Sequence, residues 1–175
     1  MIVLCIAAFV LSLAPIRTYL REGDNAPALA VGMAAQQTGD ALTDAARREL
    51  GSTIHPAIAV NWLLPPGSRV LFVGEAAPLY YRLDRITYNT VWDRSPLGLI
   101  LRDHADDPEA VCQTLRSLGF THVLVNPTML DIWQRDGWND PSITRRSVQE
   151  FLESAAEPIF DFPRPSEITI YALPQ

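Results

Sequence analysis

The chain has 175 residues, 48% of them hydrophobic, which is enough for one domain with a substantial core. It carries 14 basic and 20 acidic residues, a formal net charge of -6, and every basic residue is an arginine. A negative chain without a basic run repels phosphate backbones, so the composition argues against a nucleic-acid partner. The absence of lysine also excludes Schiff-base chemistry and the phosphate-binding lysine of a P-loop.

The residues that usually bind metals are scattered along the sequence. Cys5 and Cys112 form no CxxC motif, and His55, His104 and His122 do not cluster with them or with one another. We therefore expect no metal site and no disulfide, and no motif in the sequence implies a cofactor.

The N-terminus begins with an apolar run, "MIVLCIAAFVLSLAP", in which 14 uncharged residues precede Pro15. As a helix this run would be ~21 Å long, shorter than a hydrocarbon core of ~30 Å. Arg17, Tyr19 and Arg21 follow the run, as is typical of the interfacial end of a membrane helix. We expect residues 1–22 to form a membrane-anchor helix or the remnant of a final transmembrane span. A signal peptide and a buried helix of a soluble domain are the alternatives.

Residues 23–175 are expected to form a single α/β domain. Helical spacing predicts helices over 40–50 and 55–64, the second beginning at Pro56 and ending at "PPG". Residues 70–73 are continuously apolar, which is typical of a strand covered on both faces. The following "GEAAPL" lacks the further glycines of a dinucleotide-binding loop. The runs "LYYRL" and "ITYNTVW" then predict a β-hairpin that turns at "DR".

The second half of the sequence alternates helices and strands. Helices are expected over 95–103, 107–119, 127–138 and 140–156, with Ser95, Asp107 and Asp140 as N-caps. Strands are expected over 121–126, 157–162 and 166–173. This order predicts a three-layer α/β domain with a mixed, mainly parallel central sheet. The sheet would have a Rossmann-like core with β-hairpin insertions, and the N-terminal hydrophobic helix would precede it.

Several of these segments together resemble a known group of proteins. "LPPGSRVL", the following "GE", the aromatic residues before "DR", "LGFTHVLVN" and the closing "ITIYAL" are similar to motifs in one domain of certain membrane enzymes. That domain is the extracytoplasmic C-terminal domain of multi-pass glycosyltransferases of the dolichyl-phosphate-mannose protein mannosyltransferase type and their bacterial relatives. The similarity covers residues 15–173.

The resemblance implies a role beside a membrane enzyme. These enzymes transfer a sugar from a polyprenyl-phosphate donor, and their catalytic acidic residues lie in early membrane loops that match no position in this chain. We therefore expect a non-catalytic accessory domain, on the extracytoplasmic side of a membrane, that covers the active site or positions an acceptor. The expected partners are the membrane, the transmembrane part of a glycosyltransferase, and a carbohydrate or lipid-linked sugar.

Two other functional classes remain open: a membrane-anchored binding or scaffold domain unrelated to sugar transfer, and a free-standing α/β enzyme. If the domain binds a ligand, we expect the site near the ends of the two apolar strands, where ligands bind in open α/β sheets. The candidate ligand-binding residues are Gly74, Glu75, Tyr80, Asp93, Arg94 and Asn126. The alternative for the same residues is purely structural, with turns and caps accounting for each type. Trp133 and Trp138 are expected to pack or to contact a partner.

Overall fold

The computed structural model describes residues 54–90, 92–162 and 167–174. The α-helices are α4 (Pro56–Ile58), α5 (Pro96–Asp103), α6 (Pro108–Ser117), α7 (Pro127–Arg135) and α8 (Arg145–Ala155), with a π-helix η1 (Ala59–Leu63) and a 3-10 helix η2 (Pro78–Tyr80). The strands are β1 (Val70–Val73), β2 (Ile86–Thr87), β3 (His122–Val125), β4 (Glu157–Phe162) and β5 (Ile168–Ala172). The expected helices over 1–22 and 40–50 lie outside the described residues.

These strands form one mixed sheet in the order β2-β1-β3-β5-β4. Val70 of β1 lies opposite Ile86 of β2 on one side and His122 of β3 on the other, and both pairings are parallel. The β3–β5 and β4–β5 pairings are antiparallel. A mixed α/β fold is therefore confirmed, although the sheet joins a parallel half to an antiparallel half and is less dominated by parallel pairing than the sequence predicted.

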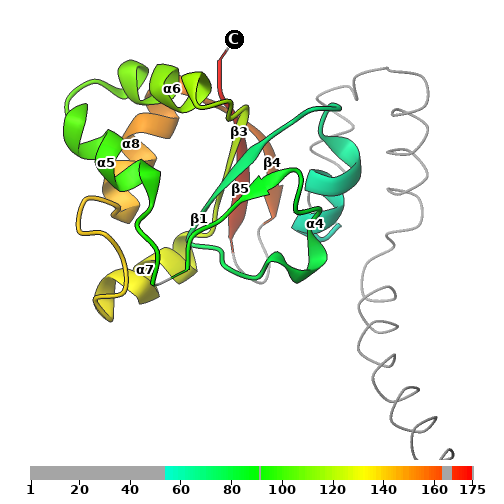
Figure 1. Cartoon of the computed structure of the whole chain (residues 1–175), viewed down its shortest axis with the longest axis horizontal. Helices are drawn as coiled ribbons and strands as arrows, with labels where there is room; N and C mark the ends of the chain where they lie inside the picture. The colour runs from blue at the N-terminus through cyan, green and yellow to red at the C-terminus, as the bar shows by residue number, and fades with distance from the viewer. Residues whose placement is uncertain (1–53, 91, 163–166, 175) are drawn as a thin grey trace, which may run out of the picture.

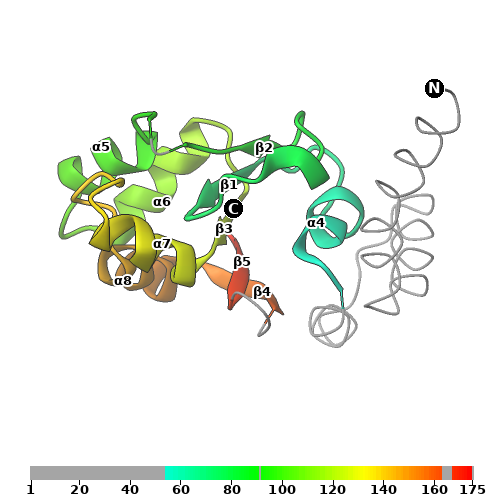
Figure 2. The ribbon, with the colours of Figure 1, turned by 90° about the horizontal axis from the view of Figure 1, so that it is seen from below.

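Helices pack against both faces of the sheet (Figures 1 and 2). Alternate residues of β1 point to opposite faces, as the pleat requires. Leu71 and Val73 belong to a buried cluster with α5, α6, α7 and α8, whereas Val70 and Phe72 belong to a cluster with α4 and η1. Burial on both faces explains the uninterrupted apolar residues of β1 and of Val123, Leu124 and Val125 in β3, which His122 begins.

Helix starts follow the predicted proline pattern, but the cap predictions hold only in part: Ser95 stands at the N-cap position of α5 and its side chain makes no capping hydrogen bond. Pro96, Pro108 and Pro127 each occupy the first turn of a helix, and the Asp107 side chain accepts a hydrogen bond from the amide of Ala110 at 3.0 Å. The prediction that Asp140 caps the last long helix is wrong. Thr144 caps α8 instead, in a reciprocal capping box with Ser147.

The predicted hairpin over 79–92 is also wrong. Pro78 starts the 3-10 helix η2, and the chain then returns so that β2 pairs in parallel with β1. Tyr81 turns inward onto Phe72, with the ring centroids 4.6 Å apart, and this contact uses an aromatic residue that the sequence pattern had assigned to a strand. The side chain of Arg85, only 7% exposed, donates to the carbonyls of Val60 and Leu64 and so caps the end of η1.

Candidate functional site

The carboxyl ends of β1 and β3 lie side by side, as the sequence predicted. Val73 pairs with Val125, and the amide of Asn126 donates to the carbonyl of Val73 at 2.9 Å. Gly74 follows with φ of 73°, and a Cβ atom at this position would lie 2.4 Å from the carbonyl oxygen of Asn126. A glycine is thus required here by close packing of backbone, and the geometry does not depend on a ligand.

The polar candidates at this edge hold the protein's own backbone. Asn126 is buried, and its side-chain oxygen accepts from the amide of Met129 at 3.1 Å, which caps α7. Glu75 accepts from the amide of Ala77 at 2.8 Å. The structure therefore brings Gly74, Glu75 and Asn126 together, and each has a local structural contact.

Asp93 and Arg94 lie in the loop between β2 and α5. Asp93 accepts from the amide and the hydroxyl of Thr90, at 3.1 and 2.7 Å, and these bonds hold its pKa below the ordinary value. Arg94 is exposed, and among the residues that the structure describes its guanidinium forms no ion pair with Asp93. Asp93 and Arg94 are the two charged candidates that are exposed.

Tyr80 contacts the first helical segment of the described chain. Its carbonyl accepts from Asn61 at 2.8 Å, and its ring stands edge-on to that of His55 with centroids 6.1 Å apart. These contacts join Tyr80 to α4 and η1. Its side chain is 55% exposed, so its surface is open to a ligand or partner.

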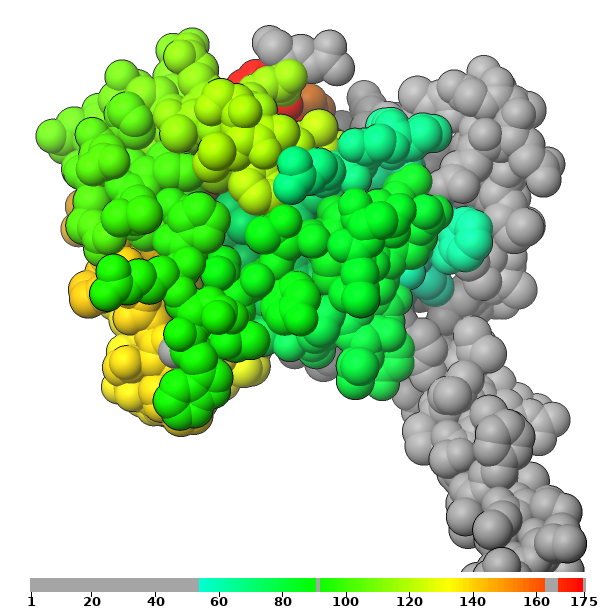
Figure 3. Space-filling view, viewed as in Figure 1, coloured from blue at the N-terminus to red at the C-terminus, as the bar shows by residue number. Residues whose placement is uncertain are grey.

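Two apolar residues that sequence reasoning had placed in strands are almost fully exposed. Leu79 is 88% exposed and Trp92 is 91% exposed. Because β1 and β2 are parallel, the loops that carry Leu79 and Trp92 leave the same edge of the sheet. Figure 3 shows that the segment between β1 and α5, coloured green, lies at the surface of the face drawn. The available signal was Pro78, which is unfavourable inside a strand.

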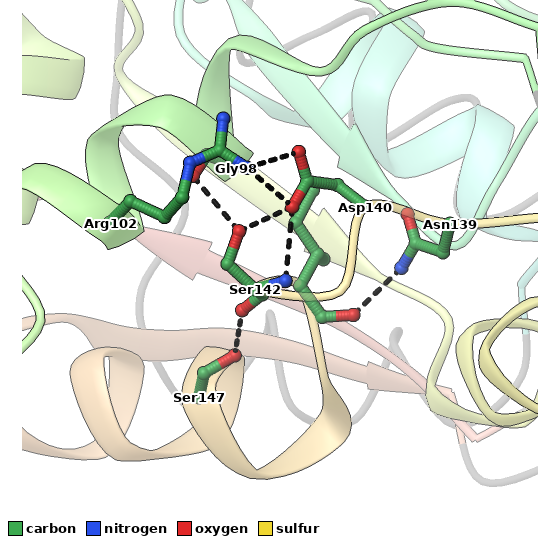
Figure 4. Close-up of polar contacts among 7 residues, drawn as sticks. Gly98, Arg102, Asn139, Asp140, Ser142 and Ser147 are labelled. Atoms are coloured by element: carbon green, nitrogen blue, oxygen red, sulfur yellow. Dashed lines mark hydrogen bonds and ion pairs between the residues drawn. The ribbon is translucent and has the colours of Figure 1, made fainter.

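Asp140 organises a polar cluster at the start of α5 (Figure 4). It accepts two bonds from Arg102, at 3.0 and 2.9 Å, and it also accepts from the amide and the hydroxyl of Ser142. The hydrogen bonds from Ser142, together with Arg102, hold the pKa of Asp140 below its usual range. Ser142 in turn donates to the carbonyl of Gly98 at 3.0 Å. The cluster fastens the loop before α8 to α5.

Two hollows lie at different ends of the parallel strands, the larger at the amino end of β3 and the smaller reaching its carboxyl end at Val125. A groove of about 990 Å³ runs along their amino ends, where Arg116 donates to the carbonyls of Leu173 and Pro174. His122, also in this groove, is buried, with Nδ1 2.7 Å from the Thr121 hydroxyl. A smaller pocket of about 380 Å³ lies between α8 and the β4–β5 pair and is lined by six polar residues, Arg145, Gln149, Asp161, Glu167, Thr169 and Tyr171.

Three further findings bear on function. Within the described ranges no group of three or more His, Cys, Asp or Glu residues is arranged to hold a metal ion. No helix in those same ranges has the length and apolar character needed to cross a membrane. No protein-family profile, curated protein or solved structure matches the chain.

Proposed function

We propose that this chain is a non-catalytic, extracytoplasmic accessory domain of a polyprenyl-phosphate-sugar-dependent membrane glycosyltransferase. Residues 1–22 hold it at the membrane, and the α/β domain covers the membrane-embedded active site or positions the acceptor. The enzyme class comes from the resemblance of residues 15–173 to such domains. The N-terminal hydrophobic helix and the Rossmann-like relationship of the sheet belong to the same proposal.

The observation that carries the proposal is the exposure of Leu79 and Trp92. Large apolar side chains that are 88% and 91% exposed, in loops from one sheet edge, are suited to contact with another surface. Tryptophan is also enriched at protein interfaces and at membrane–water interfaces. In an accessory domain this edge is the one that we expect to face the transferase and the bilayer.

The positions of the motif residues support a non-catalytic role. Gly67 occupies the turn before β1 with φ of 80°, Arg85 caps η1, and Asn126 caps α7. Each of these residues belongs to the segments that resemble the transferase domains. The shared pattern therefore describes a scaffold, which is consistent with chemistry performed by another part of the enzyme.

Gene disruption in the organism that encodes the chain tests this function. We expect mass spectrometry of surface glycans to show loss of a sugar modification, and we expect the full chain to restore it. A chain with Leu79→Ser and Trp92→Ser should accumulate normally yet restore the modification poorly, because it lacks the docking residues.

The matched control carries Leu118→Ser and Trp138→Ser, which alter two other apolar residues that are 48% and 52% exposed. This control should restore the modification as well as the unaltered chain does. Unchanged glycans after disruption would favour the scaffold alternative. If both double variants restored the modification equally well, Leu79 and Trp92 would not be the residues that contact the transferase.

A further inference from the structure

The pocket between α8 and the β4–β5 pair is built from three separate parts of the chain. On α8, Arg145, Val148, Gln149 and Leu152 recur at intervals of three and four residues and therefore share one face of the helix. Figure 2 shows α7 and α8 on one side of β5 and β4. These four residues of α8 face the strands β4 and β5 across the pocket, so regular elements form both walls of the pocket.

The strand surface is fixed by register. Thr169 pairs with Val125 and with Asp161, and Tyr171 pairs with Val123. Paired residues in a sheet share a face, and Val123 and Val125 point toward the helices. Asp161, Thr169 and Tyr171 consequently lie on the face of the sheet that α6, α7 and α8 cover.

The charged groups at the pocket mouth are held in place. Arg145 donates to Asp131 of α7 at 2.9 Å, and its second terminal nitrogen lies 3.6 Å from the carboxylate of Glu167. Glu167 has a left-handed backbone with φ of 51°, which is unfavourable for a residue with a side chain. Strained residues of this kind concentrate at ligand-binding sites. The ion pair to Arg145 holds this carboxylate at the mouth of the pocket.

Several hydrogen-bonding atoms remain available at the pocket, where Gln149 and Asp161 are exposed and Thr169 and Tyr171 are partly buried. The Thr169 hydroxyl donates to Oδ1 of Asp161 at 3.2 Å, while Oδ2 of Asp161 has no donor among residues of the described part of the chain. Gln149 donates to Glu153 at 2.7 Å through its amide nitrogen, and its side-chain oxygen stays available as an acceptor. Tyr171 is half-buried, and burial, with the nearby Glu153 and Asp161, raises its pKa, so its hydroxyl remains a neutral donor and acceptor.

The charge of the lining selects the class of ligand. One arginine faces two lining carboxylates, and Arg145 already lies against Asp131 and Glu167. The remaining negative charge disfavours phosphates and other anions. Hydroxyl groups both donate and accept, which matches the mixed set of Asp161, Gln149 and Tyr171. Val125, Leu130 and Leu152 form the floor of the pocket and are at most 8% exposed, so the polar side chains are the groups that a ligand would contact.

We propose that this pocket binds a neutral hexopyranoside, held by Asp161, Gln149 and Tyr171. Its volume of about 380 Å³ lies in the range of small-molecule sites. The inference deepens the proposed function, on which it rests for the biological source of the sugar: the site would hold part of a neutral acceptor glycan. The phosphate of a lipid-linked donor is not its ligand.

To test the site, the full chain in nanodiscs is titrated with methyl α-glucopyranoside and with methyl α-mannopyranoside. The readout is the change in amide chemical shifts measured by NMR. We expect saturable shifts around residues 149 and 169–171 with a Kd on the order of 1 mM. Asp161→Asn and Tyr171→Phe should each weaken binding on the order of tenfold, because the first replaces a charged acceptor oxygen by a donor and the second removes a hydroxyl group. The controls Glu150→Gln and Tyr88→Phe alter one carboxylate and one tyrosine outside the pocket. They should leave the affinity for the glycosides unchanged.

Three results would overturn the inference. The first is no saturable shift with either glycoside, and the second is binding to the Asp161→Asn and Tyr171→Phe variants that is as tight as binding to the unaltered chain. The third is tighter binding of glucose 1-phosphate than of the glycosides. The outcome is independent of the glycan analysis described above. A failed titration with a clear glycan phenotype removes only the sugar site, and a successful titration without a phenotype removes only the transferase role.

Discussion

His55 caps α4 through Nδ1, which accepts a hydrogen bond from the amide of Ala57 at 3.1 Å. Burial lowers the pKa of this imidazole below its ordinary value of 6.5. The unfolded chain therefore binds a proton at His55 more readily than the folded chain does. As the pH falls through 6.5 toward the lower folded pKa, this histidine reduces stability, and above 6.5 its contribution is constant.

Urea unfolding of the full chain at pH 7.5 and 5.5 measures this effect. We expect the free energy of unfolding to fall between these pH values in the unaltered chain, and to fall less in His55→Asn. Asparagine is a good N-cap residue that does not titrate, so the variant keeps the cap and removes the proton. An identical decrease in both proteins would show that His55 is not responsible.

Gly98 and Asp140 are coupled by direct contact. A Cβ atom on Gly98 would lie 2.6 Å from both Cγ and Oδ2 of Asp140, whose position is fixed by Ser142 and Arg102. Gly98→Ala should therefore destabilise the chain by about 1–3 kcal/mol through overpacking. In an Asp140→Ala background the same change should cost less, because only the Cβ of residue 140 remains close, at 3.1 Å, and alanine is the better helix former.

A double-mutant cycle by urea unfolding measures this coupling. Additive effects of the two substitutions would contradict the contact. This cluster was not predictable from sequence, because Asp140 stands before a proline and a helix and so has the local pattern of a cap. Its real partners, Gly98 and Arg102, lie in α5, and only the packing of α5 against the loop brings them together.

The elements themselves divide into those fixed locally and those fixed by packing. Helices α5, α6 and α7 begin close to where proline and cap residues predicted. Strand β1 is an uninterrupted apolar run, and β3 is apolar after His122. The expected hairpin failed because aromatic and β-branched residues suit any half-buried extended segment. The π-helix η1 was missed because its widened turn depends on Asn61 and Arg85, which bond to distant backbone.

The turn from β1 toward η2 depends on Gly74, for which Gly67 offers a matched comparison. Both residues have positive φ, of 73° and 80°, but a Cβ atom on Gly67 would have nothing within 4 Å, whereas on Gly74 it would meet the Asn126 carbonyl. Gly67→Ala should cost about 1 kcal/mol from backbone strain alone.

Gly74→Ala should cost at least 2 kcal/mol more than Gly67→Ala, because the ends of β1 and β3 must separate to admit the methyl group. Thermal unfolding of the two variants beside the unaltered chain gives the comparison. Equal losses would mean that the strand ends are not packed as closely as described. Of the six candidate ligand-binding residues, Gly74, Glu75 and Asn126 lie together at the strand ends, as the sequence predicted. Ligand binding by any of the six stays a prediction.

The whole molecule offers two candidate surfaces. The loops carrying Leu79 and Trp92 leave the carboxyl edge of β1 and β2, while the α8–β5 pocket lies between α8 and the antiparallel strands and reaches the carboxyl end of β3 at Val125. A domain with these two surfaces can contact a membrane enzyme through one and hold a neutral sugar in the other. The sequence indicated the first role only through resemblance, and the pocket was not predictable because its walls come from α8, β4 and β5.

The most direct test of the accessory role is site-specific photo-crosslinking in native membranes. A benzophenone side chain placed at Trp92 should form covalent adducts with a multi-span glycosyltransferase, identified by mass spectrometry, and the same group at Trp138 should not. Adducts from position 92 that contain only soluble proteins, or the same adducts from both positions, would contradict the account.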